Sequence, residues 1–135
     1  MLLPSVILLL SLTEGSTIPP ASDDLAQGGP VTVHVTYRVI PGKETQFKAM
    51  LSRAWEVYRR DNLVKSEPHI LVQDLDEDKK PRYVEIFSWA SLSVAEHPTT
   101  NVWSVWREVH TLCEYRNGHS AIQADKVKLL MPIAK

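Results

Sequence analysis

The spacing of apolar residues changes at Pro41-Gly42, and this change constrains the fold more than any other feature of the chain. Before it, every second residue from Val31 to Val39 is apolar, which predicts a strand with one apolar face. After it, apolar side chains recur at helical spacing from Lys43 to about Asp61. The folded part of the chain is therefore predicted to begin with a strand followed by a helix.

A predicted hairpin follows this helix. Pro68 opens a strand from His69 to Asp74, the charged residues 76–80 form a solvated turn, and Arg82–Trp89 returns as the second strand. One face of the return strand carries four large or charged side chains, and the other face carries Val84 and Ile86. The first face comprises Tyr83, Glu85, Phe87 and Trp89.

A second helix is predicted after Pro98. Apolar residues continue at helical spacing up to Cys113, and Asn117-Gly118 is a typical signal for a helix end. Lys126–Met131 is predicted to be a last short strand. It is expected to end before Pro132, because proline cannot donate a hydrogen bond to a sheet ladder.

The order of these elements predicts an α+β fold. The arrangement β-α-β-β-α-β is the ferredoxin-like one, in which two helices cover one face of a four-stranded antiparallel sheet. The other face would expose Val84 and Ile86, together with Ile70 and Val72. We expect a homodimer to bury this face, because each apolar side chain removed from water contributes about 1.5–3 kcal/mol. His34 and Arg38 are predicted to point toward that interface.

Composition indicates one globular domain without a charged binding surface. Of the 135 residues, 44% are hydrophobic, and the net charge of −1 comes from scattered Lys, Arg, Asp and Glu. Neither nucleic acid nor an anionic membrane is an expected partner. Cys113 is the only cysteine, so an intrachain disulfide is excluded, and we expect a buried thiol in the core.

The first thirty residues differ from the rest. Residues 1–21 contain an aliphatic run with the shape of a signal peptide, too short for a comfortable membrane span, and residues 22–30 form a flexible lead-in. Residues 31–135 are the predicted domain. We expect export to a periplasmic or extracellular location and no stable membrane span in the mature chain. A wrong start codon would instead leave the protein in the cytoplasm.

Several short motifs resemble one protein family over about Val31–Leu130. The antibiotic biosynthesis monooxygenase domain, of the dimeric α+β barrel superfamily, shows a similar order and spacing of these motifs. They are Pro41-Gly42-Lys43-Glu44 with Phe47, Gln73-Asp74, Glu85-x-x-x-Trp89-x-Ser91, and His97. The resemblance implies a pocket between sheet and helices. It also implies a cofactor-independent oxygenation of a small aromatic molecule, a quinol or phenol, by dioxygen.

The resemblance also implies which residues surround the substrate. The floor would be Val35, Tyr37, Glu85, Phe87 and Trp89, and the second helix would add Trp103, Trp106 and His110. The candidate catalytic residues are His97 and His110, because an imidazole titrates near neutral pH and can act as a base.

Structural explanations exist for the same residues. His97 could cap the second helix by bonding a backbone carbonyl beside Pro98, and Trp89 could simply fill the core. Glu85 must be paired or protonated if it is buried, and a salt bridge to an arginine such as Arg107 is the favoured explanation.

No cofactor or metal site is expected. The chain has no H-E-x-x-H or paired-cysteine motif. Haem-degrading relatives of the family carry an asparagine on the first strand, where this chain has an aliphatic residue near Val35, and only His110 could supply the axial ligand. Haem degradation is therefore disfavoured, whereas a non-catalytic ligand-binding protein and a purely structural dimer remain open alternatives.

Overall fold

The computed structural model describes residues 29–130. The predicted signal peptide, most of the lead-in and residues 131–135 lie outside the described residues. The elements, in chain order, are β1 (Val31–Arg38), α3 (Glu44–Arg60), β2 (Val64–Leu75), β3 (Pro81–Trp89), α4 (Leu92–Glu96), α5 (Thr100–His110) and β4 (Ile122–Lys126). The predicted order β-α-β-β-α-β is confirmed, with the short helix α4 as an addition.

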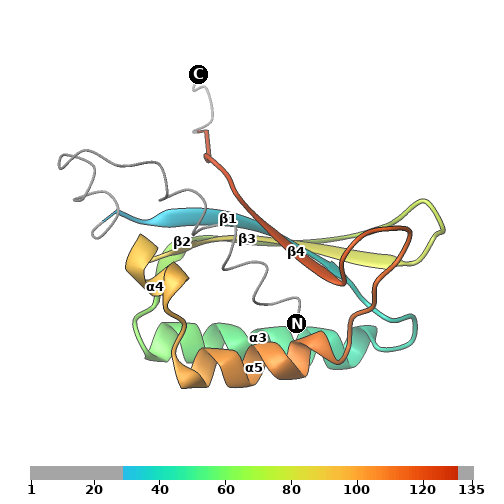
Figure 1. Cartoon of the computed structure of the whole chain (residues 1–135), viewed down its shortest axis with the longest axis horizontal. Helices are drawn as coiled ribbons and strands as arrows, with labels where there is room; N and C mark the ends of the chain where they lie inside the picture. The colour runs from blue at the N-terminus through green and yellow to red at the C-terminus, as the bar shows by residue number, and fades with distance from the viewer. Residues whose placement is uncertain (1–28, 131–135) are drawn as a thin grey trace.

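The four strands form one antiparallel sheet in the order β2-β3-β1-β4. The helices α3 and α5 lie side by side on one face of this sheet (Figure 1). This is the ferredoxin-like α+β architecture that the alternation of apolar residues predicts. Within residues 29–130, no helix is both long and apolar enough to cross a membrane.

The core lies between the sheet and the two helices. Strand β1 turns its odd-numbered side chains toward the helices, and α3 meets them with residues spaced three or four apart. Helix α5 contributes three valines in the same way. The buried helix residues are Phe47, Leu51, Ala54, Tyr58, Val102, Val105 and Val109.

The opposite face of the sheet carries an apolar patch, as predicted. Val84 pairs with Val72, and Ile86 pairs with Ile70, so the four side chains point to the same side. Ile70 and Val72 are 43% and 50% exposed. The helices leave this apolar surface uncovered.

Two predicted boundaries after α5 are wrong. The helix ends at His110 instead of Asn117, because Cys113 forms a bridge with Val39 and the chain becomes extended there. The last strand is β4, which begins at Ile122 and ends where the predicted strand began. Ile122 and Ala124 are the buried side chains of β4, and a single alanine as the second apolar position made this alternation hard to see in the sequence.

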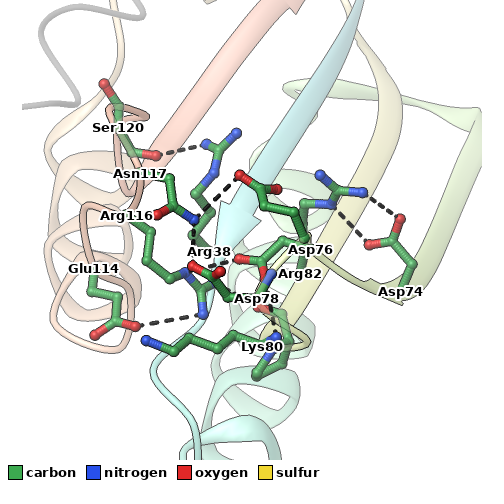
Figure 2. A network of polar contacts seen from close by, with 12 residues as sticks. Arg38, Asp74, Asp76, Asp78, Lys80, Arg82, Glu114, Arg116, Asn117 and Ser120 are labelled. Carbon is green, nitrogen blue, oxygen red and sulfur yellow. Dashed lines mark hydrogen bonds and ion pairs between the residues drawn. The ribbon is translucent and has the colours of Figure 1, made fainter.

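The turn between β2 and β3 is held by a polar network (Figure 2). The carboxylate of Asp76 accepts hydrogen bonds from the backbone N–H groups of Asp78 and Lys80, at 2.8 and 3.0 Å. Arg116 places its Nε 3.3 Å from the same carboxylate and donates from a terminal nitrogen to the carbonyl of Pro81. Asp76 and Arg116 are buried, so the predicted solvated turn is in fact anchored to the segment that follows α5.

Candidate active site

A carboxylate is buried at the centre of the sheet. Glu85 lies on β3, faces the helices and is 1% exposed. A carboxylate in such a place needs hydrogen-bond partners. Glu85 has two: Tyr37 donates from its hydroxyl at 2.7 Å, and Nε2 of His69 lies 2.9 Å from the other oxygen.

The register of the sheet brings these three side chains together. Tyr37 on β1 lies opposite Tyr83, and His69 on β2 lies opposite Phe87. Both partners are therefore diagonal to Glu85, one on each side of β3, within reach of long side chains.

Strand β2 reaches this register through an irregularity. Between Val64 and His69 the strand advances five residues, while its partner advances only two, from Trp89 to Phe87. Three residues more than a regular ladder requires are therefore accommodated near Pro68, which has no N–H to donate. Beyond this bulge, regular pairing continues from His69 to the hairpin turn.

The imidazole of His69 lies at the edge of the sheet and is partly accessible. Its ring stacks on the indole of Trp55 from α3, with centroids 3.6 Å apart and planes at 13°. The His69 side chain is 31% exposed, in contrast to the buried Glu85. The arrangement therefore joins a buried carboxylate to an imidazole that a small molecule can reach.

His69 is not among the site residues predicted from the sequence, which assigned it only to the start of a strand from His69 to Asp74. The predicted hairpin nevertheless contains the information that places His69 beside Glu85. A turn centred on Asp78 pairs residues whose numbers add up to 156, as Leu75 and Pro81 do, and this rule places His69 opposite Phe87. His69 and Glu85 then share a face.

The partner predicted for Glu85 was also wrong. Arg107 is exposed on α5, and the carboxylate is instead bound by Tyr37 and His69. Burial, together with the nearby charge of Glu85, raises the pKa of Tyr37 well above its ordinary value. The Tyr37 hydroxyl therefore keeps its proton and serves as a permanent donor to the carboxylate.

The other residues predicted to line a substrate site are gathered in one aromatic cluster. Trp89 is 5% exposed, and its ring centroid lies 5.1 Å from Tyr58, 5.0 Å from Phe87 and 6.0 Å from Trp106. Trp106 donates from its indole nitrogen to the hydroxyl of Tyr58 at 2.7 Å, and Trp103 packs edge-on against Trp106. Val35 is buried in the same core. Their contribution to ligand binding stays a prediction.

The two histidines predicted as catalytic lie apart. His97 follows α4 as its C-terminal cap, where its backbone N–H donates to Ser93 and its side chain is exposed. His110 is the last residue of α5, an eleven-residue helix that spans roughly 16 Å. His110 is half-buried, and burial lowers the pKa of its imidazole. A joint role for the pair is therefore disfavoured by geometry, and a catalytic role for either one stays a prediction.

Comparison with solved structures identifies the fold. SnoaB from Streptomyces nogalater, a cofactor-independent oxygenase, superposes with a TM-score of 0.57 at 16% identity, covering 78% of this chain and 98% of SnoaB. A candidate antibiotic biosynthesis monooxygenase from Caulobacter crescentus gives 0.57 at 14% identity, over 82% and 98% of the two chains. A third, from Bordetella bronchiseptica, gives 0.56 at 14%, over 76% and 98%.

These likenesses show that residues 29–130 have the fold of antibiotic biosynthesis monooxygenases, as the sequence motifs implied. No protein-family model matches the chain, and no curated protein is similar to it in sequence.

Proposed function

We propose that this protein is a cofactor-independent monooxygenase of a small aromatic substrate, a quinol or another phenol. The observation that carries the proposal is the buried carboxylate of Glu85, hydrogen-bonded to a partly exposed imidazole on a fold shared with an oxygenase. Replacing a buried ionic group by apolar side chains is often neutral or stabilising. A buried carboxylate is therefore better explained by chemistry than by stability.

The chemistry requires little from the protein. A base removes the hydroxyl proton of the phenol, and the electron-rich anion reduces dioxygen by one electron. The two radicals combine at a ring carbon. Breakage of the oxygen–oxygen bond then releases one oxygen atom as water and leaves the other as a carbonyl. The balance is one phenol and one dioxygen giving one quinone and one water.

Oxygen uptake tests this proposal directly. The purified protein is mixed with a panel of hydroquinones, simple phenols and anthrones in an oxygen-electrode cell. We expect protein-dependent uptake with at least one member of the panel, and one atom of ¹⁸O from labelled dioxygen in the product. Uptake no faster than in buffer for the whole panel would contradict the proposal.

A non-catalytic binding protein is the second candidate. Its support is the burial of Val35, Phe87 and Trp89 among core side chains, where they stabilise the fold whether or not a ligand binds. Quenching of tryptophan fluorescence by a hydroquinone, without any oxygen uptake, would favour this candidate over an enzyme.

We also propose that the protein acts as a homodimer. The support is the apolar patch of Ile70, Val72, Val84 and Ile86 on the face of the sheet that the helices leave uncovered. Burial of several such side chains, at about 1.5–3 kcal/mol each, is enough to hold two sheets together. Light scattering after size-exclusion chromatography should give twice the chain mass, and Ile86→Glu should give a monomer. A wild-type monomer at low micromolar concentration would refute the dimer.

A further inference from the structure

We propose that Nδ1 of His69 is the atom that receives the hydroxyl proton of the phenolic substrate, with Glu85 and Tyr37 as positioning residues. This inference rests on the proposed oxygenase function and deepens it. It locates the reacting hydroxyl at the edge of the sheet, between β2 and α3, and away from His97 and His110.

The contact with Glu85 determines the tautomer of His69. Its Nε2 lies 2.9 Å from a carboxylate oxygen of Glu85, and an ionised carboxylate can only accept a hydrogen bond. Nε2 therefore carries the ring proton of the neutral imidazole, and Nδ1 carries a lone pair. Within residues 29–130, no hydrogen bond occupies Nδ1 of His69, so this lone pair is available to a substrate.

Glu85 also stabilises the protonated ring of His69. When Nδ1 takes a proton, His69 becomes a cation in direct contact with the carboxylate of Glu85. Such a charge-assisted hydrogen bond is roughly twice as strong as a neutral one. Glu85 is only 1% exposed, so water screens this attraction from the side of His69, which is 31% exposed, and not from the side of the carboxylate. The buried carboxylate thus lowers the cost of forming the imidazolium without itself touching the substrate.

The contacts of His69 and Glu85 hold the imidazole ring in a fixed orientation. Tyr37 holds the carboxylate from the far side at 2.7 Å, and Trp55 covers one face of the imidazole at 3.6 Å. The ring of His69 is therefore fixed both in its plane and across it. A base whose orientation is fixed before the substrate binds needs no reorganisation when the proton moves.

The groups that surround Nδ1 of His69 indicate the kind of substrate that fits there. Each oxygen of the buried Glu85 carboxylate already has a hydrogen-bond partner, Tyr37 or His69. The polar contact offered to a ligand is therefore a single hydrogen-bond acceptor, Nδ1 of His69. The neighbouring indole of Trp55 is half-buried and presents an apolar aromatic surface beside it. One acceptor next to an aromatic wall suits a neutral phenol or hydroquinone with one hydroxyl at the site.

Three variants test the role in turnover. His69→Asn removes the base and keeps a polar side chain, so we expect kcat to fall by about 10²–10⁴-fold with a smaller change in KM. Glu85→Gln can place an amide N–H against Nε2, which moves the ring proton to Nδ1 and should also lower kcat. The control is His119→Asn, an exposed histidine at the far turn, which should leave kcat unchanged.

Nitrogen NMR of the full chain tests the inference without turnover. With ¹⁵N-labelled histidine, the neutral ring of His69 should show protonated Nε2 and unprotonated Nδ1, and Glu85→Gln should reverse this pattern. Addition of p-cresol, a phenol, should move the Nδ1 resonance of His69 in the wild type, whereas toluene, which lacks the hydroxyl, should leave it in place.

The outcomes separate the two proposals. If the wild-type protein oxidises a phenol and His69→Asn does so within threefold of the same rate, the oxygenase function stands and the role of His69 is overturned. If the wild-type protein is inactive but p-cresol moves the Nδ1 resonance, the oxygenase function fails and His69 remains the contact for a phenolic hydroxyl. A protonated Nδ1, or a resonance that p-cresol does not move, overturns the inference.

Discussion

Two buried tyrosines offer a matched test of how Glu85 is held. Tyr37 and Tyr83 are 6% and 1% exposed, and both rings contact Phe47, at centroid distances of 5.1 and 4.7 Å. The Tyr37 hydroxyl donates to Glu85, whereas the Tyr83 hydroxyl has no hydrogen-bond partner among residues 29–130. Replacing each by phenylalanine removes one oxygen and leaves the packing of the ring in place.

The two changes should have different effects on the free energy of unfolding. Tyr37→Phe removes a hydrogen bond to a charged group, which typically costs about 1.5–3 kcal/mol. For a chain of this length, this corresponds to a decrease in Tm of roughly 6–12 °C, at about 4 °C per kcal/mol. Tyr83→Phe removes a buried hydroxyl without a partner, so its effect should be neutral or stabilising.

Urea denaturation at pH 7 and one fixed protein concentration gives both values. The m-values should match the wild type, because neither change alters the surface exposed on unfolding. A difference of less than about 0.5 kcal/mol between the two variants, which is the ordinary scatter of neutral substitutions, would refute the description of Tyr37 as a partner of a buried charge.

Three further predictions concern other parts of the chain. Trp89→Ala should destabilise the protein by about 3–5 kcal/mol in the same denaturation experiment, because its indole is enclosed by three aromatic rings, and a loss below about 1 kcal/mol would argue against a core role. Backbone hydrogen bonding from Lys80 lowers the pKa of Asp76, so its stabilising effect is present above the unfolded value, about 3.9, and is lost as the pH falls through the lower folded value. Asp76→Asn should therefore weaken the dependence of Tm on pH below about pH 4, and an unchanged acid profile would contradict this reasoning. Burial raises the pKa of Cys113 to about 12, so Ellman's reagent should react with this thiol at pH 8 only after unfolding in urea, and prompt reaction of the native protein would count against it.

Much of the architecture could be predicted because its signals are local. Alternation along Val31–Val39 and helical spacing after Lys43 each follow from the way successive side chains point in a strand or a helix. The faces of β3 were predicted correctly for the same reason, including the position of Glu85 on the helix side and of Ile86 on the open side.

The remaining features depend on contacts between distant residues. Helix α5 ends at His110 because Cys113 pairs with Val39, seventy-four positions earlier, and no local pattern records that pairing. The partners of Glu85 depend on the joint register of β1, β2 and β3. A histidine that follows a proline carries no local sign of a buried carboxylate sixteen positions later in the sequence, since His69 and Glu85 become neighbours only when the hairpin closes.

The polar network at the hairpin turn has a consequence for a site at the other end of the strand. Pairing from Leu75 and Pro81 back to His69 and Phe87 is uninterrupted, so the pair that closes the turn determines which β2 side chain lies on the same face as Glu85. One residue inserted between the turn and Pro81, with the turn itself unchanged in length, would pair His69 with Ile86 and send the imidazole to the opposite face of the sheet. The ion pair of Arg116 and Asp76 lies roughly 23 Å along the strand from His69. By holding the turn in place, it helps to fix the register between β2 and β3. The contact between His69 and Glu85 can therefore be lost by a change of chain length that alters neither residue.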